Sequence, residues 1–347
     1  MEEISEEGSS VPLGLRFKTG IICNIKHPAD KSDVIPDEEA EFDNLSTVQA
    51  IQQSLKKFGV ESVIIEADAD LSENIRKSGV KLAFNIAEGR HGRDREAQVP
   101  AVLEMLGIPF TGSDAAALSV SLDKAMCKRL AASYGVRTAA YAIVTPKKNA
   151  KLPKLNYPVI VKPDAEGSGK GISEKCVAET PEELKCLLGN ELSAYHEDVL
   201  IEEYLPGREF TVGLLGNGAS VKVMPPMEVI FRGNTQRDYK VYSYKIKCDY
   251  TNFIDYKCPA DIDAAALKEM TKASKSVFNA LGCQDLSRID FRMDAQGHPC
   301  FLEINPLPGL APVYSDFPMI AQACGLDYDH LILKIYLTAV RRLQKQK

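Results

Sequence analysis

The stretch VIVKPDAEGSGKGIS, residues 159–173, constrains the fold more than any other part of the chain. An apolar run leads into it and ends at Lys162, and three glycines follow at alternate positions, Gly167, Gly169 and Gly171. Without side chains, such a loop lets backbone N–H groups approach a phosphate closely. The segment after the loop reads as extended, so the glycines connect two strands. A phosphate-binding hairpin loop is predicted, with a plain turn of small residues as the alternative.

Two common phosphate loops are excluded by the residues present. The pattern G-x-x-x-x-G-K-[ST] would need glycine at 164 and serine or threonine at 171, where this chain has Asp164 and Gly171. A dinucleotide-binding fingerprint directly follows the first strand of a βαβ unit and opens a helix. This loop instead lies deep in the chain between strands, which is closer to the glycine-rich loop of protein kinases.

The pattern of strands and helices divides the chain into units of different class, α/β and α+β. Residues 16–121 alternate strands with helices, which predicts a Rossmann-like domain with a parallel sheet covered on both faces. Residues 122–205 form an α+β unit that contains the glycine loop, and residues 206–347 form a second α+β unit. The acidic, polar residues 1–15 are predicted to be a disordered tail.

Composition excludes several classes of protein. The net charge of −6 gives a nucleic-acid partner no general electrostatic support. No apolar run approaches the roughly 18 residues of a membrane span. The nine cysteines include no C-x-x-C pair and are odd in number, so reduced thiols and a cytoplasmic location are predicted, without a zinc site or a disulfide framework.

A second candidate site lies in SRIDFRMDAQGHPCFLEIN, which reads as two strands joined by a turn. Side chains alternate along a strand, so Asp290 shares a face with Arg288, and Glu303 shares one with Asn305. If the strands pair, two carboxylates and an amide oxygen converge, a set suited to Mg²⁺ holding nucleotide phosphates. Arg288 would stabilise an oxyanion or phosphoryl oxygens. A surface hairpin with solvated charges is the alternative.

Two weaker signals point the same way. Glu202 and Glu203 end a buried strand, where they would accept hydrogen bonds from an adenine amino group or ribose hydroxyls, or simply face solvent. Lys124 would reach phosphates or be an ordinary helix lysine. Neither signal carries a prediction alone.

Taken in order, these stretches resemble the ATP-grasp superfamily, and specifically the D-alanine–D-alanine ligase family. The resemblance rests on Lys124, VIVKP…EGSGKG, LIEEYLPGREFTV, RIDF…FLEINPLPG and FNIAEG…Q…LEMLGIPFTGSD, and it spans about Phe84 to the C-terminus. It implies an ATP-grasp fold, in which two α+β lobes sandwich ATP behind a Rossmann-like domain. It also implies a carboxylate–amine ligase: ATP phosphorylates one amino acid, the amine of a second attacks the acyl phosphate, and an amide forms.

The resemblance also implies cofactors, partners and roles for single residues. The cofactors are ATP and two Mg²⁺ or Mn²⁺, and the partners are small amino-acid or amine substrates, with a homodimer possible. The implied nucleotide contacts are Lys124, Lys162, Gly167, Gly169, Glu202, Leu205 and Glu209. The implied metal ligands are Asp290, Glu303 and Asn305. The implied catalytic groups are Ser168 of the loop, the phosphate-binding Lys247, and Arg288 with the Gly309 N–H at the oxyanion.

The departures from the family gather on the substrate side. Glu41 or Asp43 would anchor the ammonium of the first substrate, in a loose register, and Glu88 stands where the pattern HGxxGEDG has its histidine. Arg93 and Arg95 are added cations that would hold an extra carboxylate. The predicted substrate residues are Glu41, Glu88, Arg93 and, with one extra residue allowed after Gly309, Ser315. A ligase for peptidoglycan D-alanyl-D-alanine is the simplest reading, a ligase for another amino acid or amine is the second, and a non-catalytic nucleotide-binding protein is the third.

Overall fold

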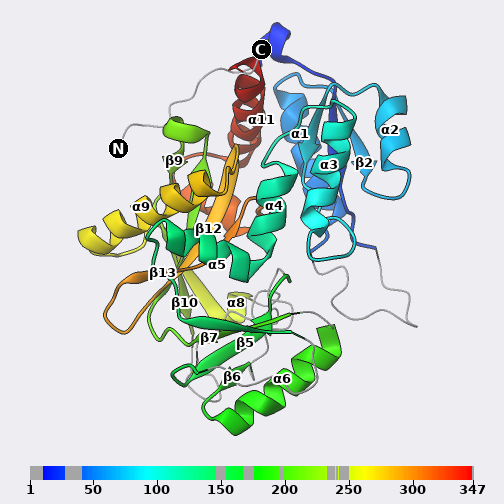
Figure 1. Cartoon of the computed structure of the whole chain (residues 1–347). Coiled ribbons are helices and arrows are strands. Elements are labelled where there is room, and N and C mark those ends of the chain that lie inside the picture. Colours follow the sequence, from blue (N-terminus) through cyan, green and yellow to red (C-terminus); the bar gives the residue numbers. More distant parts are fainter. Residues whose placement is uncertain are drawn as a thin grey trace.

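The computed structural model shows a chain built around three separate sheets (Figure 1). It describes residues 11–27, 41–145, 154–166, 176–195, 198–232, 239, 241 and 250–345. One sheet is parallel and two are antiparallel, so the predicted combination of α/β and α+β units is confirmed.

The first sheet has the order β2-β1-β3, and its strands run parallel. The strands are β1 (Thr19–Cys23), β2 (Ser62–Glu66) and β3 (Leu82–Asn85). The helices of this unit are α1 (Leu45–Lys57), α2 (Leu71–Ser78) and α3 (Gln98–Met105), with 3₁₀ turns η1 (Leu13–Leu15) and η2 (Arg95–Ala97). Every residue of β1 and β3 is buried, as expected for parallel strands covered on both faces. After α3, the stretch IPFTG forms an isolated bridge between Ala83 and Phe110.

The second sheet has the order β4-β7-β5-β6 and is antiparallel. Its strands are β4 (Tyr141–Val144), β5 (Val159–Pro163), β6 (Val177–Ala178) and β7 (Val199–Glu203), and α6 (Pro181–Tyr195) packs on it. Two helices, α4 (Ala115–Leu122) and α5 (Lys124–Ser133), precede it. The sheet has its own small core, which includes Val159, Val161 and Ile201. The glycine loop between β5 and β6 lies outside the described residues.

The third sheet has the order β11-β10-β8-β12-β13, with β9 paired to β8. Its strands are β8 (Glu209–Leu215), β9 (Lys222–Val223), β10 (Met227–Phe231), β11 (Ile254–Lys257), β12 (Leu286–Met293) and β13 (Pro299–Asn305). The helices are α8 (Tyr250–Phe253), α9 (Ala264–Ala280), α10 (Asp316–Ala323) and α11 (Tyr328–Lys345), with a 3₁₀ turn η3 (Gly218–Ser220). Helix α11 returns to pack along α1, so one continuous core joins residues of the first and third units (Figure 1).

The start of the chain differs from the tail predicted over residues 1–15. Val11 is fully buried and its backbone N–H donates to the carbonyl of Phe58. Leu15 accepts a hydrogen bond from the hydroxyl of Tyr336 on α11. Residues 11–15 therefore belong to the first unit, because an apolar side chain at position 11 is covered by the core that α1 and α11 share.

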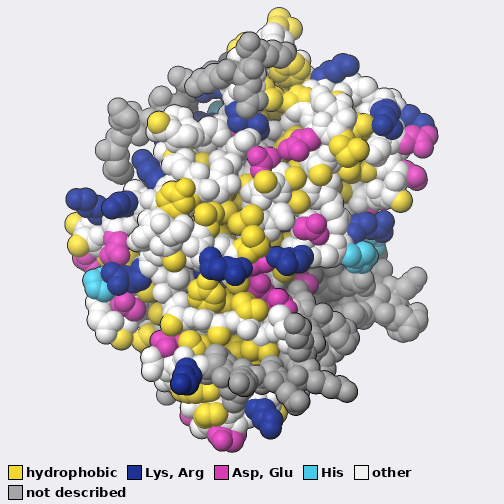
Figure 2. All heavy atoms as spheres, in the orientation of Figure 1, with side chains coloured by type: hydrophobic (Ala, Val, Ile, Leu, Met, Phe, Trp, Pro, Cys, Tyr) yellow, Lys and Arg dark blue, Asp and Glu magenta, His cyan; other side chains and the backbone are white. Residues whose placement is uncertain are grey.

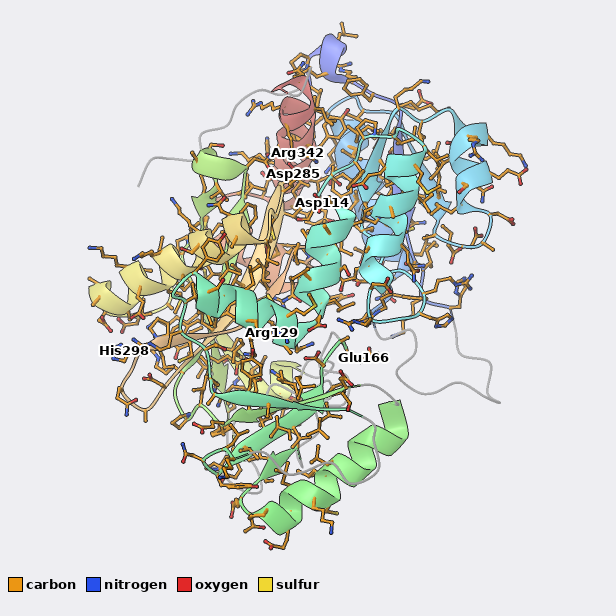
Figure 3. All side chains as sticks on the ribbon, in the orientation of Figure 1. Asp114, Arg129, Glu166, Asp285, His298 and Arg342 are labelled. Atoms are coloured by element: carbon orange, nitrogen blue, oxygen red, sulfur yellow. The ribbon has the colours of Figure 1, made fainter. Side chains whose placement is uncertain are left out.

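A buried ion pair ties the last helix to the rest of the molecule. Asp285 is fully buried just before β12 and has a positive φ of 63°. Its carboxylate accepts from the Gly112 N–H at 2.9 Å, from Asn217 at 2.8 Å and from Arg342 of α11 at 2.9 Å. Arg342 also donates to the carbonyl of Phe110 at 2.8 Å. Figure 3 shows the two side chains meeting where α11 passes the third sheet.

Replacing Asp285 with asparagine is expected to lower the free energy of unfolding by about 2 kcal/mol, the scale of a lost charged hydrogen bond. Asparagine tolerates the same positive φ, so the measurement isolates the charge. Asp114→Asn is the matched control, because Asp114 caps α4 through the Ala117 N–H and asparagine caps equally well. Urea unfolding of both variants checks this, and equal midpoints would contradict it.

Candidate active site

The β12–β13 hairpin places the predicted metal ligands together. In the antiparallel register Asp290 lies opposite Glu303, and Arg288 lies opposite Asn305. Directly opposed residues on paired strands share a face. The amide nitrogen of Asn305 lies 3.5 Å from a carboxylate oxygen of Asp290. The strands therefore pair as the sequence predicted, and the three oxygen-bearing side chains lie on one face.

Arg288 sits at the centre of this face. Its guanidinium donates two hydrogen bonds to Asp290, at 3.0 and 2.9 Å, and lies 3.7 Å from Asp316 at the start of α10. Burial opposes its charge, but the two aspartates raise the pKa of Arg288 overall. The arginine is therefore a fixed, charged donor held beside the oxygen ligands.

Lys124 connects the hairpin to the start of the glycine loop. It is the first residue of α5, whose N-cap Asp123 accepts from the Met126 N–H at 2.7 Å. The buried Lys124 ammonium donates to the backbone carbonyl of Glu166 at 2.5 Å and lies 3.9 Å from a carboxylate oxygen of Glu303. One cation therefore contacts both the hairpin and the segment that leads into the glycines.

Lys162 belongs to a buried cluster of three charges. The two carboxylate oxygens of Glu202 lie 2.5 Å from the Lys162 ammonium and 2.6 Å from that of Lys128. Burial would raise the pKa of Glu202, but the two lysines lower it to about 2. Burial lowers the pKa of Lys128, whereas for Lys162 burial is outweighed by Glu202 and Glu303, which raise the pKa. The predicted contact of Glu202 with adenine stays a prediction; here its carboxylate holds two lysines.

Lys128 is a site residue that the sequence reasoning missed. It follows Lys124 by four residues, a spacing that puts both on one side of α5. Its ammonium also donates to the Thr138 hydroxyl at 3.0 Å. The helical spacing was the available signal, but its carboxylate partner lies on β7, far away in the chain.

The residues predicted to hold the adenine and ribose lie where β7 passes into β8. Leu205 is half-buried, and Glu209 is the first residue of β8. The Glu209 carboxylate accepts from Arg292 at 3.2 Å, and Arg292 also donates to the Tyr204 hydroxyl at 2.8 Å. The Arg292 guanidinium lies 4.8 Å from the centre of the Tyr204 ring. These contacts fix the connection between the second and third sheets.

On the substrate side, Gly309 and Ser315 come together. A Cβ added at Gly309 would lie 3.0 Å from the Ser315 hydroxyl oxygen. That oxygen accepts from the Ala311 N–H at 3.1 Å, and Ser315 is the N-cap of α10. The predicted oxyanion amide and the predicted contact for the second substrate are thus neighbours, beside Asp316 and Arg288.

Glu41, Glu88 and the two added arginines lie at the carboxyl ends of β1 and β3. Arg95 is buried and forks onto Glu41 at 2.8 to 3.1 Å, whereas Arg93 is exposed and pairs with Asp123. Burial, followed by neighbouring carboxylates, raises the pKa of Glu88 well above its usual range. Burial likewise raises the pKa of Glu96 to about 8. On the face drawn in Figure 2, acidic and basic side chains form a band across the middle of the molecule.

Four predicted residues, Gly167, Ser168, Gly169 and Lys247, lie outside the described residues, and their roles stay predictions.

Comparison with known proteins identifies the family. Residues 130–336 match the family described as D-ala D-ala ligase C-terminus. The D-alanine–D-alanine ligase of Bordetella petrii is 32% identical over 294 residues, which cover 84% of this chain and 86% of that protein. That of Citrifermentans bemidjiense is 33% identical over 297 residues, 85% of this chain and 91% of that protein.

Solved structures agree on the fold. A D-alanine–D-alanine ligase from Bacillus anthracis complexed with ATP superposes with a TM-score of 0.74. It is 22% identical, and the match covers 95% of this chain and all of that one. The predicted ATP-grasp fold is confirmed by this likeness, and the predicted family by the relatives. The chain therefore belongs to the D-alanine–D-alanine ligase family of ATP-dependent ligases.

Proposed function

We propose that this chain joins two amino acids at the cost of ATP, with D-alanine in both positions as the first substrates to test. The observation that carries the proposal is the β12–β13 hairpin, which holds Arg288 and three oxygen ligands on one face beside two buried lysines. A protein that only bound a nucleotide would need no arginine fixed beside the phosphate end. The product would be D-alanyl-D-alanine, the peptidoglycan dipeptide that the family resemblance implies.

The residues present fit a magnesium site. Asp290, Glu303 and Asn305 supply hard oxygen ligands, and Thr211 lies opposite Asp290 on β8 with a buried hydroxyl that has no hydrogen-bond partner among the described residues. No group of three or more His, Cys, Asp or Glu side chains gathers for a metal in the part of the chain that the structure describes. The site would therefore use two carboxylates and an amide. Bound Mg²⁺ or Mn²⁺ would neutralise phosphate charge.

The chain's own groups would do the rest by position and charge. Lys124 and Lys162 would hold the phosphates in line with the carboxylate of the first amino acid. Arg288 and the Gly309 N–H would stabilise the oxyanion formed when the second amine attacks. Ser315 would receive the carboxylate of the second amino acid. Glu41 and Glu88 would face the ammonium of the first.

The second candidate is a ligase for another amino acid or amine, and the contacts of the added arginines give little support to a substrate with an extra carboxylate. Arg95 contacts Glu41 and the Ala165 carbonyl, and Arg93 pairs with Asp123. Both cations therefore already have anionic or carbonyl partners within the protein.

Compartment and assembly complete the proposal. The eight cysteines in the described ranges are free thiols, which supports a cytoplasmic location. Across those same ranges no helix has both the length and the apolar character needed to cross a bilayer. A homodimer stays a prediction, drawn from the family resemblance.

The test is ADP formation with ATP, Mg²⁺ and single or paired D- and L-amino acids, with products identified by mass spectrometry. ADP and D-alanyl-D-alanine are expected in equal amounts when D-alanine is supplied. If ADP forms only with a different pair of amino acids, the ligase activity still stands and that pair replaces D-alanine as the proposed substrates. Nucleotide binding without ADP formation under any pair would overturn the proposal.

A further inference from the structure

Arg95 joins three segments that are far apart in sequence. It begins η2 in the first unit and is 6% exposed. Its guanidinium contacts both carboxylate oxygens of Glu41, donates to the carbonyl of Ala165 at 2.8 Å and lies 3.5 Å from a carboxylate oxygen of Glu166. Figure 3 shows Glu166 between the second unit and the lower end of the first.

The segment that Arg95 reaches is also held by α5. Asp164 accepts from the Ala125 N–H at 3.0 Å through its side chain and from the Lys124 N–H at 3.2 Å through its carbonyl. The Lys124 ammonium donates a hydrogen bond to the backbone carbonyl of Glu166. Residues 164–166 are therefore held between Lys124, the predicted phosphate contact, on one side and Arg95 on the other.

The backbone around Arg95 is shaped to bring it there. Gly89 has a φ of 76°, and a Cβ at this position would lie 2.0 Å from the carbonyl oxygen of Arg95. Only glycine allows the segment that carries Glu88 to pack against η2 so closely. The carboxyl groups of Glu88, Glu96 and Asp43 lie in the same region. The Arg95 guanidinium is a buried cation among these carboxyl groups.

We propose that Arg95 is a positioning residue that sets Glu41, on the first-substrate side, in register with Lys124 and residues 164–166 on the phosphate side. This inference rests on the proposed function. In this role Arg95 would act through Glu41 and residues 164–166, with which it is in contact, and would fix the distance across which the phosphoryl group must meet the amino-acid carboxylate. A fork of two hydrogen bonds defines direction as well as distance, which a lysine would not reproduce.

The first experiment measures coupling in turnover. In Arg95→Met, the Michaelis constant of the first amino acid and the ratio of ADP to ligated product are each expected to rise about tenfold, because a small misplacement of reactants is enough for such a loss. The Michaelis constant of ATP is expected to change by less than about threefold. For Arg95→Lys, both the Michaelis constant of the first amino acid and the ratio of ADP to product should lie between those of wild type and Arg95→Met. Arg90→Met is the matched control, because Arg90 is an exposed arginine in the same loop.

A second measurement needs no turnover. Amide hydrogen exchange over residues 154–166 without ligand is expected to be faster in Arg95→Met than in Arg90→Met, with little change in α9. A double-mutant cycle with Glu41→Gln should be strongly non-additive, because the two residues act through one contact.

If amide exchange over residues 154–166 is the same in Arg95→Met as in Arg90→Met, the inference is overturned. It is also overturned if Arg95→Met turns over more slowly but still forms one ADP per product with an unchanged Michaelis constant for the first amino acid. If Arg95→Met does not fold, Arg95→Lys decides by the same readouts. If the wild-type protein ligates no pair of amino acids, only the proposed function is overturned. The hydrogen-exchange measurement needs no turnover and still tests the role of Arg95.

Discussion

Replacing Glu303 with glutamine is expected to lower ligase turnover by about a thousandfold, roughly 4 kcal/mol of transition-state stabilisation. Glutamine keeps the shape and one carbonyl oxygen, but it removes the charge that lies opposite Asp290 and 3.9 Å from Lys124. The half-buried site has no other residue that would replace it on β13. ADP formation under saturating ATP and Mg²⁺ measures the loss.

The control for this variant is Glu269→Gln. Glu269 lies on α9, and at the surface its carboxylate pairs with Arg137 at 3.6 Å and lies 3.7 Å from the His298 ring. Its loss should change turnover less than about twofold, as is usual for exposed pairs. A Glu303→Gln enzyme that keeps more than a tenth of wild-type turnover would mean that the hairpin is not the metal site.

Replacing Glu202 with glutamine is expected to destabilise the fold by about 3–5 kcal/mol, the cost of breaking a buried ion cluster. The change leaves the ammoniums of Lys128 and Lys162 buried with no anion between them. Adding Lys128→Met should recover more than about 1 kcal/mol, since it removes one of the two uncompensated charges. Glu203→Gln is the neighbouring control, because within the described part of the chain Glu203 accepts hydrogen bonds from Asn156 at the surface.

The pH dependence of unfolding tests the same cluster. The folded pKa of Glu202 is about 2, below its ordinary value of 4.5. As pH falls, the unfolded chain takes up this proton first, so the stabilisation is complete above pH 4.5 and is lost as pH falls towards 2. Between those values wild type should lose stability more steeply than Glu202→Gln. Parallel curves would show that Glu202 is not ion-paired in solution.

Much of the fold could be predicted because its signals are local. The alternation of strands and helices specified the parallel sheet, and the two-residue period of a strand placed Asp290, Glu303 and Asn305 on one face once the strands paired. Helix α4 was missed: AAALSVSL is apolar all round and has no helical stripe, and only the Asp114 cap marks its start.

The rest depended on contacts between distant segments. Arg95 was recognised as a cation near the substrate. Nothing in the local sequence indicates that its guanidinium pairs with Glu41, which lies fifty-four residues away. Lys128 was missed, because its carboxylate partner Glu202 lies on β7, far away in the chain. Such pairings are set by tertiary packing, which a local pattern does not encode.

The shared core beneath α1 and α11, together with the Asp285–Arg342 pair, has a mechanical consequence. We therefore expect the first and third units to move as one block, although the β4–β7 lobe lies between them in the sequence. The β4–β7 lobe has a separate and smaller core, and the contacts of Lys124 and Arg95 with residues 164–166 hold it to this block. We therefore expect entry of reactants and release of products to require a rotation of the β4–β7 sheet about the Tyr204–Arg292 connection, with those contacts broken in the open form.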